Sequence, residues 1–162
     1  MKIRKKSSGF TLVEIAISIL IVMVLAAGAM GYQYHSARDV RLSEVQASAA
    51  RVSMLLLEGW KGAEGTADFD PVSAFNSEIT ISASATGPSV PNDRDGMSLT
   101  LLGRYEITIE GVYFYVTLSW KDVSSLEPKV LNATTSWRRD YGQGTLEGNE
   151  PAVQYSTFYV DY

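Results

Sequence analysis

The sequence from Ile15 to Tyr32 reads IAISILIVMVLAAGAMGY. This stretch contains one polar residue, Ser18, and no charged residue. A helix from Phe10 to about Tyr32 would be roughly 34 Å long, which is enough to cross a bilayer core of about 30 Å. We therefore expect residues 10–34 to form a single membrane-spanning helix.

The charges around this apolar run predict its orientation. Four basic residues and no acid precede it: Lys2, Arg4, Lys5 and Lys6. The first charges after it are Arg38 and Asp39. The positive-inside rule then places Met1 in the cytoplasm and the C-terminal part of the chain outside. Cleavage as an ordinary secretory signal at Ala26–Ala29 is the alternative, but the apolar run is longer than the 7–15 residues of such a signal.

One carboxylate, that of Glu14, interrupts the apolar pattern near its start. A charged side chain costs about 2–3 kcal/mol at the centre of a bilayer on insertion scales, and less near the edge. Glu14 therefore either stays hydrated at the interface or has a partner that makes it a functional residue.

The stretch Ser8–Glu14, SGFTLVE, resembles the class III signal of type IV prepilins and pseudopilins. The resemblance implies that residues 1–9 are a leader, which a prepilin peptidase removes by cutting after Gly9. It also implies N-methylation of Phe10 and pairing of Glu14 with the terminal amine of a neighbouring subunit. Two groups that are each costly in lipid become acceptable when they are paired, so Glu14 would set the register during assembly.

The helical pattern continues over residues 35–60 as an amphipathic segment. Its apolar stripe recurs at spacings of four, three and four residues: Val45, Ala49, Val52 and Leu56. We expect Leu55 and Trp60 to join the core, and the glycines after Glu58 to end the helix. Gly28 and Gly31 favour either local bending of the helix or its close packing on another helix. Many type IV pilins carry a proline near the position of Gly31, so this sequence departs from the family there.

The sequence periodicity changes to two beyond a loop over residues 62–77, which predicts a β-rich domain over residues 61–162. The glycine at Glu110–Gly111 predicts a hairpin. A long helix followed by about four antiparallel strands is an α+β fold, and the resemblance implies the pilin fold, with the helix stripe over one sheet face. The candidate strand segments are 78–85, 105–110, 112–120, 129–137 and 152–160.

Aromatic residues are frequent in this part. In Tyr113–Tyr115, alternate side chains face opposite ways, so we expect at least one of them to be exposed. An exposed aromatic side chain would favour a contact surface for subunits or a ligand. Strand propensity and core packing account for the others, which include Trp120, Trp137, Tyr155 and Tyr159.

Composition excludes several functions. The chain has no cysteine and one histidine, His35, which excludes disulfides, thiol nucleophiles and cysteine-ligated zinc. We find neither a glycine-rich phosphate loop nor a nucleophile–base pair, so we expect no enzyme activity and no cofactor. Asp93 and Asp95 in NDRDG are a weak calcium candidate, and an Asx-type turn is the favoured explanation for them.

The charge balance argues against nucleic-acid partners. The net charge is −4, and removal of the leader with its four basic residues would leave ten basic residues against 18 acidic ones, a net charge of −8. Phosphate backbones require clustered lysines and arginines.

The resemblance therefore predicts a structural subunit of a type IV filament machine, a minor pilin or pseudopilin of a type IV pilus or of type II secretion. Its implied partners are prepilin peptidase, other pilin subunits, the inner-membrane assembly platform and membrane lipid. Its implied location is the bacterial inner membrane, then a filament in the periplasm or at the cell surface. The alternatives are a filament-tip binding module for adhesion or DNA uptake, and a signal-anchored enzyme.

Overall fold

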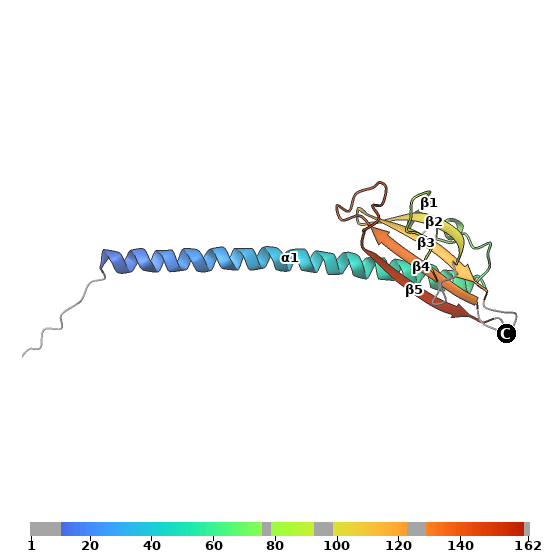
Figure 1. The fold of residues 1–162 in the computed structure, drawn as a ribbon, viewed down its shortest axis with the longest axis horizontal. Helices are drawn as coiled ribbons and strands as arrows, with labels where there is room; N and C mark the ends of the chain where they lie inside the picture. Colours follow the sequence, from blue (N-terminus) through green and yellow to red (C-terminus); the bar gives the residue numbers. More distant parts are fainter. Residues whose placement is uncertain (1–10, 76–78, 93–98, 123–128, 161–162) are drawn as a thin grey trace, which may run out of the picture. The chain divides into compact units, whose positions relative to one another are not determined.

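The computed structural model describes residues 11–75, 79–92, 99–122 and 129–160 (Figure 1). The chain divides into two compact units between Ser43 and Glu44. Helix α1, Leu12–Gly62, contributes its first part to the first unit and its last part to the second. The remaining elements form an antiparallel sheet in the second unit. This arrangement confirms the predicted α+β class with a long N-terminal helix.

In the first unit, α1 exposes every side chain from Leu12 to Ser43. The helix contains no proline, and Gly28 and Gly31 do not interrupt it. No other atom lies within 4 Å of the position that a Cβ would take at either glycine. Up to Tyr32 this exposed segment is apolar on all sides, so it requires an apolar environment from elsewhere.

The sheet of the second unit is a meander in which each strand pairs with the next along the chain (Figure 1). Its strands are β1 (Thr80–Ala83), β2 (Thr100–Ile109), β3 (Val112–Lys121), β4 (Lys129–Trp137) and β5 (Ala152–Tyr159). Glu110 and Gly111 join β2 to β3 with φ values of 50° and 79°, the left-handed conformation that a tight hairpin turn requires. The predicted hairpin is confirmed.

Two predictions for this region are wrong in detail. The sheet has five strands rather than about four, and β2 begins at Thr100 instead of Tyr105. Strand β3 supplies partners along its whole length, so that Thr100 lies opposite Trp120 across a register shift between Leu101 and Gly103. Tertiary pairing therefore extends β2 beyond the residues whose alternation shows in the sequence.

The predicted loop over residues 62–77 contains a short helix, α2 (Pro71–Phe75). The Asp70 carboxylate accepts hydrogen bonds from the backbone N–H groups of Val72 and Ser73, at 3.1 and 3.3 Å. Asp70 is thus the N-cap, and Pro71 occupies the first helical position, where its missing N–H has no consequence.

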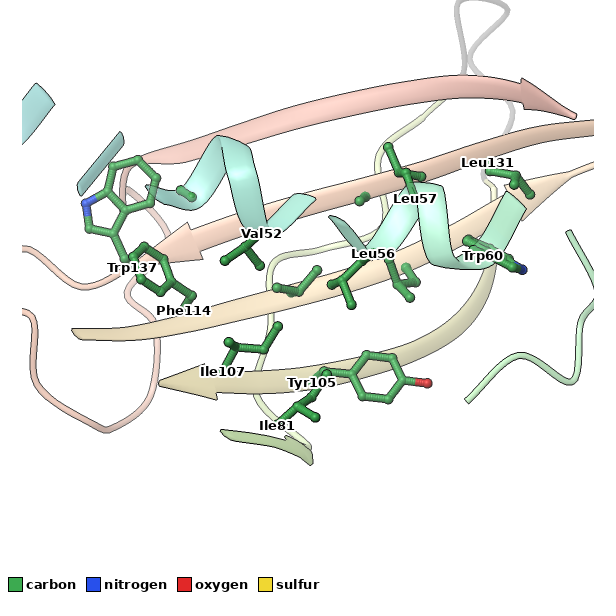
Figure 2. Close-up of a cluster of buried hydrophobic side chains, with 14 of the residues drawn as sticks. Val52, Leu56, Leu57, Trp60, Ile81, Tyr105, Ile107, Phe114, Leu131 and Trp137 are labelled. Atoms are coloured by element: carbon green, nitrogen blue, oxygen red, sulfur yellow. The ribbon is translucent and has the colours of Figure 1, made fainter. Parts of the chain in front are cut away.

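The core lies between the last part of α1 and one face of the sheet (Figure 2). The predicted stripe is confirmed, but it is wider than predicted and includes Ser53 and Leu57. Leu55 is 38% exposed, so its assignment to the core was wrong. Leu57 lies on the inward side instead, because a helix that faces a sheet buries residues at i, i+3, i+4 and i+7. The buried apolar residues of α1 are Val45, Ala49, Val52, Leu56, Leu57 and Trp60.

One polar contact crosses this apolar interface. The hydroxyl groups of Ser53 and Thr135 lie 2.6 Å apart, and Ser53 also donates to the carbonyl of Ala49 at 3.0 Å. Both side chains are fully buried. A displaced helix would remove the buried Thr135 hydroxyl from its Ser53 partner, so the contact favours one position of α1 on β4.

The second face of the sheet is also covered, which contradicts the expectation of an exposed aromatic residue in Tyr113–Tyr115. Tyr115 is 1% exposed, and its hydroxyl oxygen accepts the N–H of Gly144 at 2.7 Å. The Thr117 hydroxyl donates to the carbonyl of Pro88 at 2.7 Å. Two loop segments therefore lie over this face, and Tyr113 is half-buried.

The prediction that the glycines after Glu58 end the helix is right for Gly62, the last residue of α1, but wrong for Gly59. Gly59 is an interior residue, and the ring of Phe75 occupies the space that its Cβ would need. The helix ends instead in a Schellman motif, in which Gly65 N–H bonds to Trp60 O at 2.9 Å and Glu64 N–H to Lys61 O at 3.0 Å. Glu64 holds the left-handed conformation, φ 59°, that glycine usually supplies.

We expect Gly59→Ala to destabilise the domain by about 1–3 kcal/mol, because the added methyl group would overlap the Phe75 ring. The matched control is Gly62→Ala, where no atom lies within 4 Å of the new Cβ. Higher helix propensity should then stabilise the domain by up to about 1 kcal/mol. Thermal unfolding of the full chain in detergent, followed by circular dichroism, measures both; equal effects of the two substitutions would contradict the packing role of Gly59.

Candidate functional site

The candidate site lies at the start of α1, where Thr11 precedes the first helical residue. The Glu14 carboxylate oxygen Oε2 accepts hydrogen bonds from the backbone N–H of Thr11 and from its hydroxyl group, both at 3.1 Å. The Thr11 hydroxyl oxygen in turn accepts the N–H of Glu14 at 3.3 Å. This reciprocal arrangement is a capping box, with Thr11 as N-cap and Glu14 as the third helical residue.

The capping box explains how Glu14 is held at the edge of an apolar helix. Its carboxylate accepts two hydrogen bonds and lies in the first turn, where the helix dipole favours a negative charge. The Ser18 hydroxyl also has a hydrogen-bond partner within the helix, because it donates to the Glu14 carbonyl at 2.7 Å. The polar groups of this segment are therefore bonded within the helix, and only apolar side chains surround them.

Glu14 is a site residue predicted from the sequence, whereas Thr11 had no predicted role. The signal was present, because Thr-x-x-Glu before an apolar run is the sequence pattern of a capping box. The other predicted residues of this site, Gly9 and Phe10, lie outside the described residues. The weak calcium candidates Asp93 and Asp95 also lie outside them, and the described residues contain no group of three or more potential metal ligands.

Apolar side chains follow the capping box on every side of α1. Leu12 is 84% exposed, and the exposed residues continue through Ile15, Ile19 and Met23 to Met30. Within the described part of the chain, α1 is the one helix long and apolar enough to cross a membrane by length and composition. A signal sequence near the N-terminus would pass the same criterion.

The surface of the second unit gives little support to a nucleic-acid site. Arg138 forms a bidentate pair with Asp140, at 2.9 and 2.6 Å, and this hydrogen bonding holds the pKa of the Asp140 carboxyl below its usual range. Arg139 is also engaged: its backbone N–H bonds to Glu150 at 3.2 Å and its guanidinium to the Asn149 carbonyl at 3.3 Å. The two neighbouring arginines therefore lie among acids rather than in a basic groove.

A groove of about 650 Å³ runs beside the exposed Leu55 in the second unit. Its lining combines apolar residues, such as Val52, Ile79 and Ile109, with the charged residues Glu44, Arg51 and Glu110. It contains no pair of side chains placed for nucleophilic or acid–base chemistry.

Comparison with known families gives one result. The family profile of the prokaryotic N-terminal methylation motif matches residues 4–30. The matched segment covers the capping box and most of the exposed apolar helix. No curated protein and no solved structure matched the chain.

The motif and the fold agree on the class of protein. A methylation motif at the start of a long apolar helix, followed by a sheet packed on the same helix, supports the assignment to the class of type IV pilin-like prepilins. The profile match and the resemblance seen in the sequence rest on the same N-terminal segment. The apolar helix in this segment indicates attachment to a membrane.

We expect Thr11→Val to loosen the first turn of α1, because valine keeps the shape of threonine but removes the capping hydroxyl. Loss of an N-cap costs about 1 kcal/mol, which corresponds to roughly fivefold faster amide exchange at residues 13–15. The conservative control, Thr11→Ser, should exchange at the original rate. Hydrogen exchange by NMR on the full chain in micelles measures the difference; identical rates in all three chains would show that the capping box has no stabilising effect.

Proposed function

We propose that this chain is a minor pilin or pseudopilin, a low-abundance structural subunit of a type IV filament machine. In this proposal, prepilin peptidase removes residues 1–9 by cutting after Gly9, and Phe10 becomes the N-methylated terminus. The methylation motif over residues 4–30 is the observation that carries it. The lack of cysteines favours a minor subunit over a major one, because many major pilins close their C-terminal loop with a disulfide.

The proposal also defines the membrane state of the subunit. Residues 10–34 cross the bacterial inner membrane once with the N-terminus in the cytoplasm, and residues 35–60 continue the helix into the domain of residues 61–162. Before assembly, lipid covers the exposed apolar residues of α1. In the filament, the helices of neighbouring subunits cover them, and the assembly platform mediates the transfer.

Glu14 is the residue on which assembly depends in this proposal. In the isolated chain, its carboxylate bonds to Thr11 of the same helix. After cleavage, the amine of Phe10 in a neighbouring subunit offers a charged partner in the same apolar surroundings. An exchange of the capping bonds for this ion pair leaves neither charge unpaired, and a subunit in the wrong register could not make it.

We expect Glu14→Ala to insert into the membrane normally but to enter filaments at least about tenfold less, because an unpaired charge in apolar surroundings costs about 2 kcal/mol or more. Ser18→Ala is the matched control one turn further on, since Ser18 bonds only to the Glu14 carbonyl. Immunoblots of membrane and sheared-filament fractions measure the ratio. Normal incorporation of the Glu14→Ala chain would contradict the role of Glu14 while leaving the class of protein unchanged.

Mass spectrometry of sheared filaments and of membranes tests the proposal as a whole. We expect a peptide that begins at N-methylated Phe10, at trace abundance relative to the dominant filament subunit. High abundance in the sheared fraction would make the chain a major pilin instead. A chain that begins near Ala29, or one that retains Met1, would contradict processing after Gly9.

A further inference from the structure

Within the described residues, no strand pairs with the outer side of β5, the last strand of the sheet (Figure 1). The Trp137 N–H bonds to the Pro151 carbonyl at 3.3 Å. Because backbone groups alternate in direction along a strand, this bond shows which residues of β5 direct their N–H and C=O groups toward β4. Residues 153, 155, 157 and 159 therefore bond to β4, whereas the N–H and C=O groups of the alternate residues point away from the sheet. These outward residues are Ala152, Gln154, Ser156 and Phe158. No described residue bonds to their eight outward backbone groups.

The edge lacks the features that normally prevent strands from associating. Residues 152–159 contain no charged residue and no proline, and the pairing of β5 with β4 has no bulge. The opposite edge strand, β1, has only four residues, and α2 contacts it. Long, regular, uncharged edges pair readily with another extended backbone, whereas short edges do so poorly.

The sequence of β5 complements itself in one antiparallel register. When Tyr155 lies opposite Tyr155 of a second copy, Ala152 lies opposite Phe158, and Gln154 opposite Ser156. This register pairs all four outward residues with one another and satisfies all eight free backbone groups in each copy. A shift by two residues would place Phe158 opposite Glu150, or Ala152 opposite Val160, and would leave outward groups beyond the strand.

The distribution of charge also favours pairing of β5 with a second copy of the chain. Residues 44–162 contain 16 acidic and eight basic residues, so two copies of the domain repel each other over most of their surfaces. The ten residues from Pro151 to Val160 carry no charge at all. They form one uncharged part of the domain, where a second copy can approach without bringing like charges together, and added salt would weaken the remaining repulsion.

We propose that β5 is an interaction surface for a second copy of this chain, with the two strands paired antiparallel across a two-fold axis. The two sheets then form one continuous sheet. The contact is isologous, so it ends at a dimer rather than continuing into a fibre. It uses the edge of the domain and does not depend on the filament function proposed above.

Disulfide trapping in the full chain tests the pairing, and the absence of native cysteine makes it unambiguous. One chain carries Gln154→Cys and the other, of different tag length, carries Ser156→Cys. In the proposed register, these positions are opposite each other with Cα atoms about 5.5 Å apart, within disulfide range. Each variant alone would place its two cysteines diagonally, about 7–8 Å apart, at or beyond the limit for a disulfide.

We expect the mixed sample in detergent, at raised salt, to form disulfide-linked dimers that contain both tags, and either chain alone to form few. As a second measurement, Gln154→Pro should abolish the dimer on sizing while the near-ultraviolet dichroism stays native. Proline there removes an outward N–H and none of the backbone bonds to β4. Gln154→Thr, which keeps the N–H, should remain dimeric.

Three results would overturn the proposal. Equal crosslinking in the mixed and single samples would indicate random collision. A natively folded chain that stays monomeric and forms no mixed disulfide would show that the edge remains open. Protection of the outward amides from exchange in native membranes, but not in the concentrated pure chain, would show that a strand of another protein covers the edge.

Discussion

Burial of one stripe of α1 against the sheet is the interaction on which the domain depends. Six apolar residues of the helix enter this interface, and full burial of a large apolar side chain contributes about 1.5–3 kcal/mol. The total is on the order of 10 kcal/mol before the entropy of ordering, comparable to the net stability of a whole domain. The sheet cannot be stable without this cover, because its inner face is formed by Ile107, Phe114, Val116, Leu118 and Leu131.

That one helix has two different requirements along its length. From Glu44 onward it is amphipathic and its apolar stripe is satisfied within the chain. From Leu12 to about Tyr32 it is apolar and exposed, so this part requires an apolar environment from outside the described chain. The capping box at Thr11 and Glu14 suits this apolar part of the helix. It supplies hydrogen bonds to the Glu14 carboxylate and to the backbone N–H groups of both residues without another molecule.

The chain stabilises its second sheet face without a disulfide. Tyr115, Thr117 and Ser136 bond to the backbone of loop residues, and Gln143 reaches Glu106 across the face at 2.8 Å. The Arg138–Asp140 pair fixes the start of the loop that joins β4 to β5. Hydrogen bonds to buried strand residues thus hold a long connection in place, whereas β5 itself stays unpaired on its outer side.

The sequence by itself determined the elements whose pattern is local. The apolar run, the methylation motif, the helix stripe, the Glu110–Gly111 hairpin and the bounds of β4 depend on residue types at short spacing, and all were predicted. Tertiary structure decided the rest, because distant partners were needed. The start of β2 depends on β3, the position of Gly59 inside the helix depends on the ring of Phe75, and the burial of Tyr115 depends on Gly144. The outward groups of β5 likewise became visible only when the strand order left it at the edge, since nothing in residues 152–159 shows which strand has a neighbour on one side alone.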